Sequence, residues 1–162
     1  MGEKAEERRG EEEMREILFR GKAKDPRYEE INWLEGYLWD NGETREDFRR
    51  YFIGDLDIVK DKDGYDDING FYMFEVDPET VGQYTGRKDK NGKRIFEGDI
   101  VRCIYDTEEN TFVAVWDQEE YGFKATNGAE NYGGNFVYLG NCSEIEVIGN
   151  KWDNPEMTGG VE

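Results

Sequence analysis

The sequence contains no histidine, only two cysteines and only three prolines. Without histidine, the chain has no Ser-His or Cys-His nucleophile pair, no imidazole general base and no imidazole ligand for a metal. The two cysteines, Cys103 and Cys142, match neither a metal-binding nor a redox spacing, so we expect reduced thiols rather than a disulfide. These absences predict a protein without catalytic activity, without a cofactor and without a bound metal.

Long apolar runs are also missing from the chain. No segment approaches the roughly 20 apolar residues that span a bilayer, and residues 1–13 are charged and lack the apolar core of a signal peptide. Basic residues are scarce, with 21 against 39 acidic residues and a net charge of -18. This balance disfavours general affinity for the nucleic-acid backbone. We therefore expect a cytoplasmic protein whose acidic surface either is simply solvated or attracts a basic partner.

Aromatic residues and glycines, by contrast, are abundant. Aromatic residues make up 14% of the chain, and there are 20 glycines. Aromatic side chains bury large areas, and glycines allow the tight turns that connect short strands. The 162 residues are enough for one domain with a real core. We predict a mainly β fold, either a small antiparallel barrel or a strongly bent sheet, with at most one or two short helices.

The hydrophobic pattern predicts three parts along the chain. Residues 1–13 have no hydrophobic periodicity and are predicted to be a disordered charged extension, which makes Met14 a natural start. Residues 14–157 are predicted to form a single β-rich domain. Residues 158–162 are predicted to be a flexible tail.

Within the domain, short apolar and aromatic runs alternate with turn residues. Residues 43–53 fit either a short helix or a strand, and the Asp- and Gly-rich residues 54–70 are predicted to form a loop. The segment after Gly149 is predicted to be irregular and exposed. Strands are predicted at 15–21, 28–42, 71–86 with a break at Pro78, 99–105, 111–116, 121–125, 136–139 and 144–148.

The stretch "VGQYTGRKDKNGKRIFEGDIVRC" at residues 81–103 is the most patterned part of the chain. Asp89 to Gly92 fits a type I turn followed by a left-handed glycine, which connects a hairpin between residues 83–85 and 94–96. A second sharp turn follows at residues 97–99. The predicted turn residues are Asp89, Asn91, Gly92, Gly98 and Asp99.

Five basic residues surround this turn in an otherwise acidic chain. A hairpin tip that displays them could contact a phosphate group or a partner protein. Lysine and arginine are also common on exposed turns and edge strands, where they deter edge-to-edge pairing. Both interpretations stay open. The residues are Arg87, Lys88, Lys90, Lys93 and Arg94.

Two further patterns suggest binding sites. Residues 61–67, "DKDGYDD", begin like a calcium loop, but Tyr65, Asp66 and Tyr72 occupy positions where a ligand, a glycine and a glutamate are required. This segment is therefore better described as an acidic surface loop. A set of aromatic residues could form a stacking platform for bases, or could simply fill a small core. That set is Trp33, Trp39, Tyr84, Trp116, Tyr121 and Tyr132.

Four segments, taken in order, resemble the YopX family of phage and prophage proteins. They are "MREILFRGKAKD" at 14–25, "WLEGYL" at 33–38, "VGQYTGRKDKNGKRIFEGDIV" at 81–101 and "IEVIGNKWDNPEM" at 145–157. The chain departs from the family at residues 19–25, where the family commonly has "FRAWD" or a similar run. The resemblance implies a small, mainly β protein of temperate-phage genomes in bacteria. It carries over no activity and no catalytic residues.

Together these observations predict a phage-encoded, noncatalytic accessory protein that acts as a protein-interaction module in the cytoplasm of a bacterial host. The partner would be a host or phage protein, and a basic partner surface would suit the acidic chain electrostatically. The leading alternative is a nucleic-acid-binding accessory protein that uses residues 87–94 and exposed aromatics. A metal-dependent carboxylate enzyme ranks third, and homo-oligomerisation and the identity of the target stay open.

Overall fold

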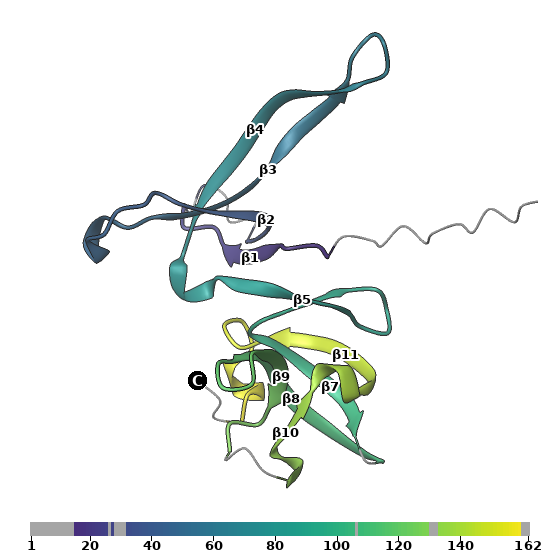
Figure 1. The fold of residues 1–162 in the computed structure, drawn as a ribbon. Helices are drawn as coiled ribbons and strands as arrows, with labels where there is room; N and C mark the ends of the chain where they lie inside the picture. Colours follow the sequence, from purple (N-terminus) through teal and green to yellow (C-terminus); the bar gives the residue numbers. More distant parts are fainter. Residues whose placement is uncertain (1–14, 26, 28–31, 106, 130–132, 160–162) are drawn as a thin grey trace, which may run out of the picture.

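The fold was analysed in a computed structural model, which describes residues 15–25, 27, 32–105, 107–129 and 133–159. The described residues form β-strands joined by turns, and the helical segments among them are short 3-10 turns. Two antiparallel sheets account for the strands (Figure 1). The prediction of a mainly β fold is confirmed. The predicted extension at residues 1–13 and the end of the predicted tail, residues 160–162, lie outside the described residues.

The first sheet is six-stranded, with the strand order β4-β3-β2-β1-β5-β6. Each neighbouring pair is antiparallel, and most pairs follow the chain order. The strands are β1 (Phe19–Lys22), β2 (Trp33–Asp40), β3 (Tyr51–Lys60), β4 (Asp66–Val76), β5 (Gly82–Lys88) and β6 (Arg94–Phe96). Figure 1 shows the β3–β4 hairpin projecting away from the rest of the molecule.

The second sheet is five-stranded, with the order β10-β9-β8-β7-β11. Its strands agree with those predicted from residue 99 onward. They are β7 (Asp99–Tyr105), β8 (Glu108–Asp117), β9 (Gly122–Thr126), β10 (Phe136–Tyr138) and β11 (Ser143–Asn150). The 3-10 turns are η2 (Glu46–Phe48), η3 (Pro78–Thr80), η4 (Gly133–Asn135), η5 (Leu139–Asn141) and η6 (Pro155–Met157). Among the described strands the sheets do not close into a barrel.

The core is divided between the sheets. The larger cluster lies mainly on the second sheet and includes Val101, Phe112 and Ala125, but Ile95 of β6 belongs to it as well. Burial of these apolar side chains supplies the main favourable free energy of folding. A smaller cluster of Leu34, Ile53 and Val76 lies in the first sheet. The outer part of the β3–β4 hairpin contributes to neither cluster and is largely exposed.

The prediction that residues 54–70 form a loop is wrong. Strands β3 and β4 extend through this segment, and only residues 61–65 form the turn. Cross-strand apolar pairs such as Leu56↔Phe71 outweigh the low strand propensity of the intervening aspartates. The Asp61 carboxylate accepts hydrogen bonds from the N–H groups of Asp63 and Tyr65, both at 2.9 Å. Asp61 thus stabilises the hairpin turn, as an Asx-type cap does.

The segment after Gly149 is irregular, as predicted, but it is not simply exposed. Trp152 packs against Trp33, with ring centroids 5.5 Å apart. The Trp33 indole N–H donates to Asp153 at 2.7 Å, and Lys151 N–H donates to the Gly98 carbonyl at 2.9 Å. This turn therefore ties the end of β11 to the first sheet. The ambiguous residues 43–53 contain one 3-10 turn and the start of β3.

Candidate functional site

The turn between β5 and β6 is held by one aspartate. Asp89 is buried, and its Oδ1 accepts hydrogen bonds from the N–H groups of Asn91 at 2.8 Å and Lys93 at 2.9 Å. Its Oδ2 accepts a third bond, at 3.1 Å, from the Val147 N–H on β11. Burial opposes the charge of Asp89, but these backbone donors lower its pKa below the usual range. Gly92 completes the turn with a φ of 83°.

Three of the five basic residues at this turn already have partners. Arg87 donates to the Cys142 carbonyl at 2.6 Å, and Lys90 pairs with Glu146 at 2.8 Å. Arg94 pairs with Glu16 at 3.1 Å. Carboxylates thus neutralise two of these five charges, and a backbone carbonyl engages a third side chain, which leaves less of the positive charge free for a phosphate.

The other two basic residues at this turn, Lys88 and Lys93, are exposed. Among the described residues neither has an ion-pair or side-chain hydrogen-bond partner. The pKa of Glu146 falls to about 2 because its carboxylate accepts hydrogen bonds from Lys90 and Arg102. The β5–β6 hairpin is therefore clamped to β11 by charge, and only two of its cations remain available to a ligand.

The second predicted turn, at residues 97–99, joins the two sheets. Asp99 at the start of β7 is fully buried, and its carboxylate pairs with Arg20 of β1 at 2.6 Å. It also accepts the Phe96 N–H at 2.8 Å. Burial raises the pKa of Asp99, although the bonds to Arg20 and Phe96 favour the charged form. Gly98, with a φ of 81°, lies against the Trp152 ring, where a Cβ would clash.

The aromatic residues singled out in the sequence do not form one platform. Trp33 packs on Trp152, Tyr84 packs on Phe96, and Trp116 packs on Phe123 in the second sheet. Tyr121 lies in the β8–β9 turn and is 82% exposed. Trp39 lies near the end of β2 in the first sheet and is 51% exposed, and Tyr132 lies outside the described residues.

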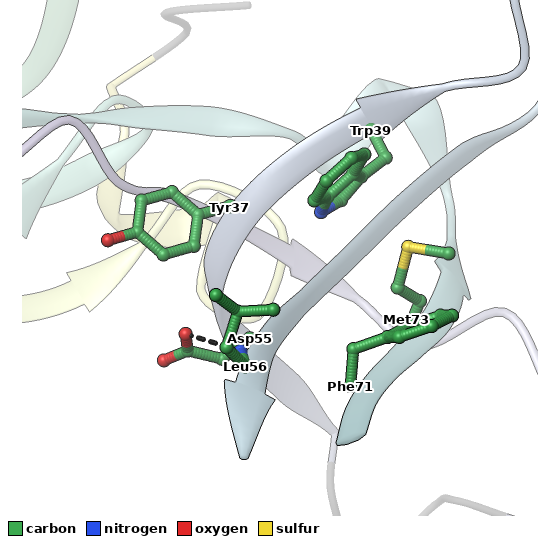
Figure 2. A pocket seen from close by; sticks show the side chains of 6 residues that line it. All are labelled: Tyr37, Trp39, Asp55, Leu56, Phe71 and Met73. Atoms are coloured by element: carbon green, nitrogen blue, oxygen red, sulfur yellow. Dashed lines mark hydrogen bonds between the residues drawn. The ribbon is translucent and has the colours of Figure 1, made fainter. Parts of the chain in front are cut away.

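An exposed apolar groove lies across β2, β3 and β4 (Figure 2). Its volume is about 250 Å³. Trp39 is 51% exposed and Phe71 is 69% exposed, so large apolar surfaces face the solvent. Asp55 lies at its rim, and its carboxylate accepts the Leu56 N–H at 2.7 Å. The apolar lining residues are Tyr37, Trp39, Leu56, Phe71 and Met73.

Strand register explains why these side chains meet. Side chains alternate between the two faces of a strand, and cross-strand partners share a face. Tyr37 is opposite Gly54, and Gly54 is opposite Met73, so Tyr37 and Met73 lie on one face of the sheet on either side of β3. Leu56 is opposite Phe71 on the same face. A Cβ on Gly54 would lie 1.8 Å from the Tyr72 carbonyl oxygen, so this glycine lets β3 and β4 approach closely between these side chains.

The same apolar surface continues toward the hairpin tip. After a register shift in β4, Ile58 is opposite Ile68, and these side chains are 55% and 61% exposed. We call this surface the apolar face. Contiguous exposed apolar area of this kind marks a binding site more often than a free surface. The apolar face consists of Tyr37, Trp39, Leu56, Ile58, Ile68, Phe71 and Met73.

The other side of the hairpin is acidic. The alternation places Asp55, Asp57 and Asp67 opposite the apolar face. Asp57 accepts a hydrogen bond from the Asn69 amide at 2.6 Å, and Asp67 accepts the Ile68 N–H at 2.9 Å. Within the described part of the chain, none of these three aspartates has a cationic partner. We call this surface the acidic face.

Sequence reasoning missed the apolar face because residues 54–70 were assigned to a loop on their aspartate and glycine content. The signal was present in the alternation of Leu56 and Ile58 with Asp55 and Asp57, which is the period of a strand with one apolar side. Within the described residues, no group of three or more Cys, Asp or Glu side chains is placed to hold a metal ion. No helix in that part is long and apolar enough to cross a membrane.

These features define a class: a mainly β, acidic protein of two antiparallel sheets with an exposed apolar face on a projecting hairpin. A family model described as YopX protein matches residues 37–158. The chain therefore belongs to the YopX family, and the resemblance seen in the sequence is confirmed. Among solved structures, the chain is similar to protein EF1440 from Enterococcus faecalis, with a TM-score of 0.46 and 21% identity over 90% of this chain and 99% of that one. No curated protein matches the sequence.

Proposed function

We propose that this protein is a phage-encoded, noncatalytic accessory protein that binds another protein through the apolar face. The observation that carries the proposal is the exposure of Trp39, Phe71 and Met73 around one groove. Fully burying one large apolar side chain stabilises a complex by about 1.5–3 kcal/mol before the costs of association. Aromatic residues and methionine are also enriched at the centres of protein interfaces. A host or phage protein in the bacterial cytoplasm is the proposed partner.

We propose a noncatalytic role because of the amino-acid composition. The chain has no histidine to act as a nucleophile's base or as a metal ligand. Its binding surface is apolar, and its acidic residues are spread over the molecule. A protein of this chemistry would act by occupying a partner's surface.

The nucleic-acid alternative has less support. It relies on the β5–β6 turn, where Arg87, Lys90 and Arg94 are engaged within the molecule. Lys88 and Lys93 alone would supply little of the phosphate neutralisation on which such binding depends. The double substitution Lys88→Ala and Lys93→Ala tests this alternative directly, because both side chains are exposed and neither forms an ion pair or a hydrogen bond with a described residue. Binding to DNA or RNA that disappears in this variant would favour the alternative.

The proposal is tested with a photo-crosslinking amino acid placed at Phe71 of the full chain. The protein is irradiated in nuclease-treated lysate of the bacterium that carries the gene. We expect a defined protein adduct from this position and none from a control position, Tyr121, which is 82% exposed in the β8–β9 turn. Phe71→Ser should weaken capture of that protein at least about tenfold, while Tyr121→Ser should not. Equal adducts from both positions, or none from Phe71, would contradict the proposal.

A further inference from the structure

Strand β4 has an open edge beside the apolar face. It is the last strand in the order of the first sheet. At its C-terminal end, Val76 bridges Ala23, and Lys24 N–H donates to the Glu75 carbonyl at 2.9 Å. Before Glu75, no described residue pairs with the outer edge of β4. Figure 1 shows this part of the hairpin extending beyond the other strands.

The direction of the backbone groups follows from these bonds. The Glu75 carbonyl points outward to Lys24, and Asp77 N–H points outward to Lys22. Successive residues of a strand direct their backbone groups to alternate edges. Met73 and Phe71 therefore present N–H and C=O groups to the open edge. The same two residues contribute side chains to the apolar face, so backbone pairing and side-chain burial are available to one ligand.

The space beside this edge is not filled by the described chain. A hollow of about 330 Å³ lies there, lined by Lys24, Asp25, Met73, Phe74 and Glu75. An unpaired strand edge next to exposed apolar side chains is the arrangement that binds extended peptides by strand addition. The main-chain groups of the edge would hold the peptide, and the apolar face would select its side chains.

The other side of the added strand would meet the acidic face. Gly70 is opposite Asp57, and a Cβ built on Gly70 would have no atom within 4 Å. A long side chain from a strand next to β4 could therefore pass over Gly70 toward the Asp57 carboxylate. A shallow hollow of about 630 Å³ lies along the hairpin here, lined by Asp55, Asp57, Gly70 and Tyr72 and also by Leu56, Ile58 and Phe71 of the apolar face. A lysine or arginine would fit it, because the aspartates have no cationic partner among the described residues.

We propose that the open edge of β4 binds an extended segment of a partner protein in which apolar residues alternate with lysine or arginine. Apolar residues would pack beside Phe71 and Met73, while the basic residues would lie on the side of Asp55 and Asp57. A second copy of this chain fits less well, because it also carries a net charge of -18 and would bring like charge to the acidic face. This inference rests on the proposed function and specifies the mode of binding.

The first test uses three short synthetic peptides and the full chain. One peptide alternates valine and lysine, the second has the same composition with the lysines grouped at one end, and the third alternates valine and glutamate. Fluorescence anisotropy should show saturable binding of the first peptide, weakened at least about tenfold by grouping, and no binding of the third. Equal binding of the first two peptides would overturn the proposal, because binding would then not depend on strand alternation.

Hydrogen exchange locates the bound peptide. The amides of Phe71 and Met73 should exchange rapidly in the free protein and become protected when the alternating peptide binds. Binding without this protection would overturn strand addition. Protection that already exists in the free protein and rises with its concentration would also overturn the proposal, because a second copy would then occupy the edge.

Substitutions test the acidic face and the open edge of β4 separately. Asp55→Lys with Asp57→Lys should abolish binding of the alternating peptide, whereas Glu119→Lys with Glu120→Lys, which changes net charge equally on another turn, should not. Met73→Pro removes an outward N–H and should weaken binding more than Met73→Ala, and circular dichroism checks that each variant is folded. Unchanged binding in the aspartate variant would contradict the proposal.

The peptide tests and the crosslinking test distinguish this inference from the proposed function. If crosslinking at Phe71 succeeds while every peptide fails to bind, strand addition is wrong and the proposed function stands. If both fail, the proposed function falls as well.

Discussion

At the scale of single residues, the ion pair between Arg20 of β1 and Asp99 of β7 joins the first sheet to the second. Both side chains are buried, and the guanidinium also lies 4.7 Å from the centroid of the Trp33 ring and 4.9 Å from that of Phe96. A buried pair of charges compensates the loss of hydration only while both partners are present. This carboxylate and guanidinium therefore form a buried link between the two sheets.

The substitution Asp99→Asn should destabilise the protein by about 3 kcal/mol, because it leaves the Arg20 charge buried and unpaired. Urea unfolding followed by tryptophan fluorescence measures the change in the free energy of unfolding. The double variant Arg20→Met with Asp99→Asn is the control, and we expect it to recover much of the loss, since no buried charge is then unpaired and the Asn carbonyl can still accept the Phe96 N–H. A loss within about 0.5 kcal/mol, the size typical of surface substitutions, would contradict this role for Asp99.

At the scale of elements, the β3–β4 hairpin depends on close approach of three backbones. An ideal Cβ on Gly36 would lie 2.4 Å from the Gly54 carbonyl oxygen, and one on Gly54 would lie 1.8 Å from the Tyr72 carbonyl oxygen. Glycine is thus required where β2, β3 and β4 cross most closely. The β3–β4 hairpin projects outward beyond this crossing (Figure 1).

We expect Gly54→Ala to destabilise the protein by about 1–3 kcal/mol, since strands must separate to make room for the methyl group. The matched control is Gly70→Ala in the same hairpin, where the added Cβ meets no atom within 4 Å. That change should be neutral or stabilising by up to about 1 kcal/mol, because alanine restricts the unfolded chain. Thermal unfolding measures the stability of both variants. Equal destabilisation by the two substitutions would contradict the close approach of the strands at Gly54.

At the scale of the whole molecule, two carboxylates hold the C-terminal segment to both sheets. Glu146 on β11 pairs with Lys90 and Arg102, which lower its pKa to about 2. Burial alone would raise the pKa of Asp153, but hydrogen bonds from Asn150, Lys22 and Trp33 lower it to about 2. In the unfolded chain these groups titrate near ~4. Their contribution to stability is therefore present above pH ~4 and is lost as the pH falls toward 2.

The double variant Glu146→Gln with Asp153→Asn should have a lower Tm than the unaltered protein at pH 7. The difference in Tm should shrink between pH ~4 and ~2, where the native carboxylates take up protons. Calorimetry across this range, with Glu119→Gln and Glu120→Gln as the control pair, tests the prediction. A difference that stays constant down to pH 2 would mean that the two side chains act through packing rather than through charge.

Prediction from sequence succeeded where the determining interactions are local. The turn at Asp89 to Gly92 is encoded by a side chain that bonds its own backbone and by a glycine with positive φ. The strands from Asp99 onward alternate clearly and are separated by turn residues. Prediction failed at residues 54–70 of the β3–β4 hairpin, because the aspartates suggested a loop while cross-strand pairing of apolar residues, such as Leu56 with Phe71, imposed strands.

By itself, the sequence determined the mainly β class, the acidic character, the absence of histidine chemistry and membership of the YopX family. These properties depend on composition, periodicity and local motifs. The tertiary structure decided which charges are available and where apolar surface is exposed. It joined Arg87, Lys90 and Arg94 to partners distant in the chain, and it brought Tyr37, Leu56 and Phe71 together through strand register. Such contacts depend on the pairing of remote segments, which no local pattern specifies.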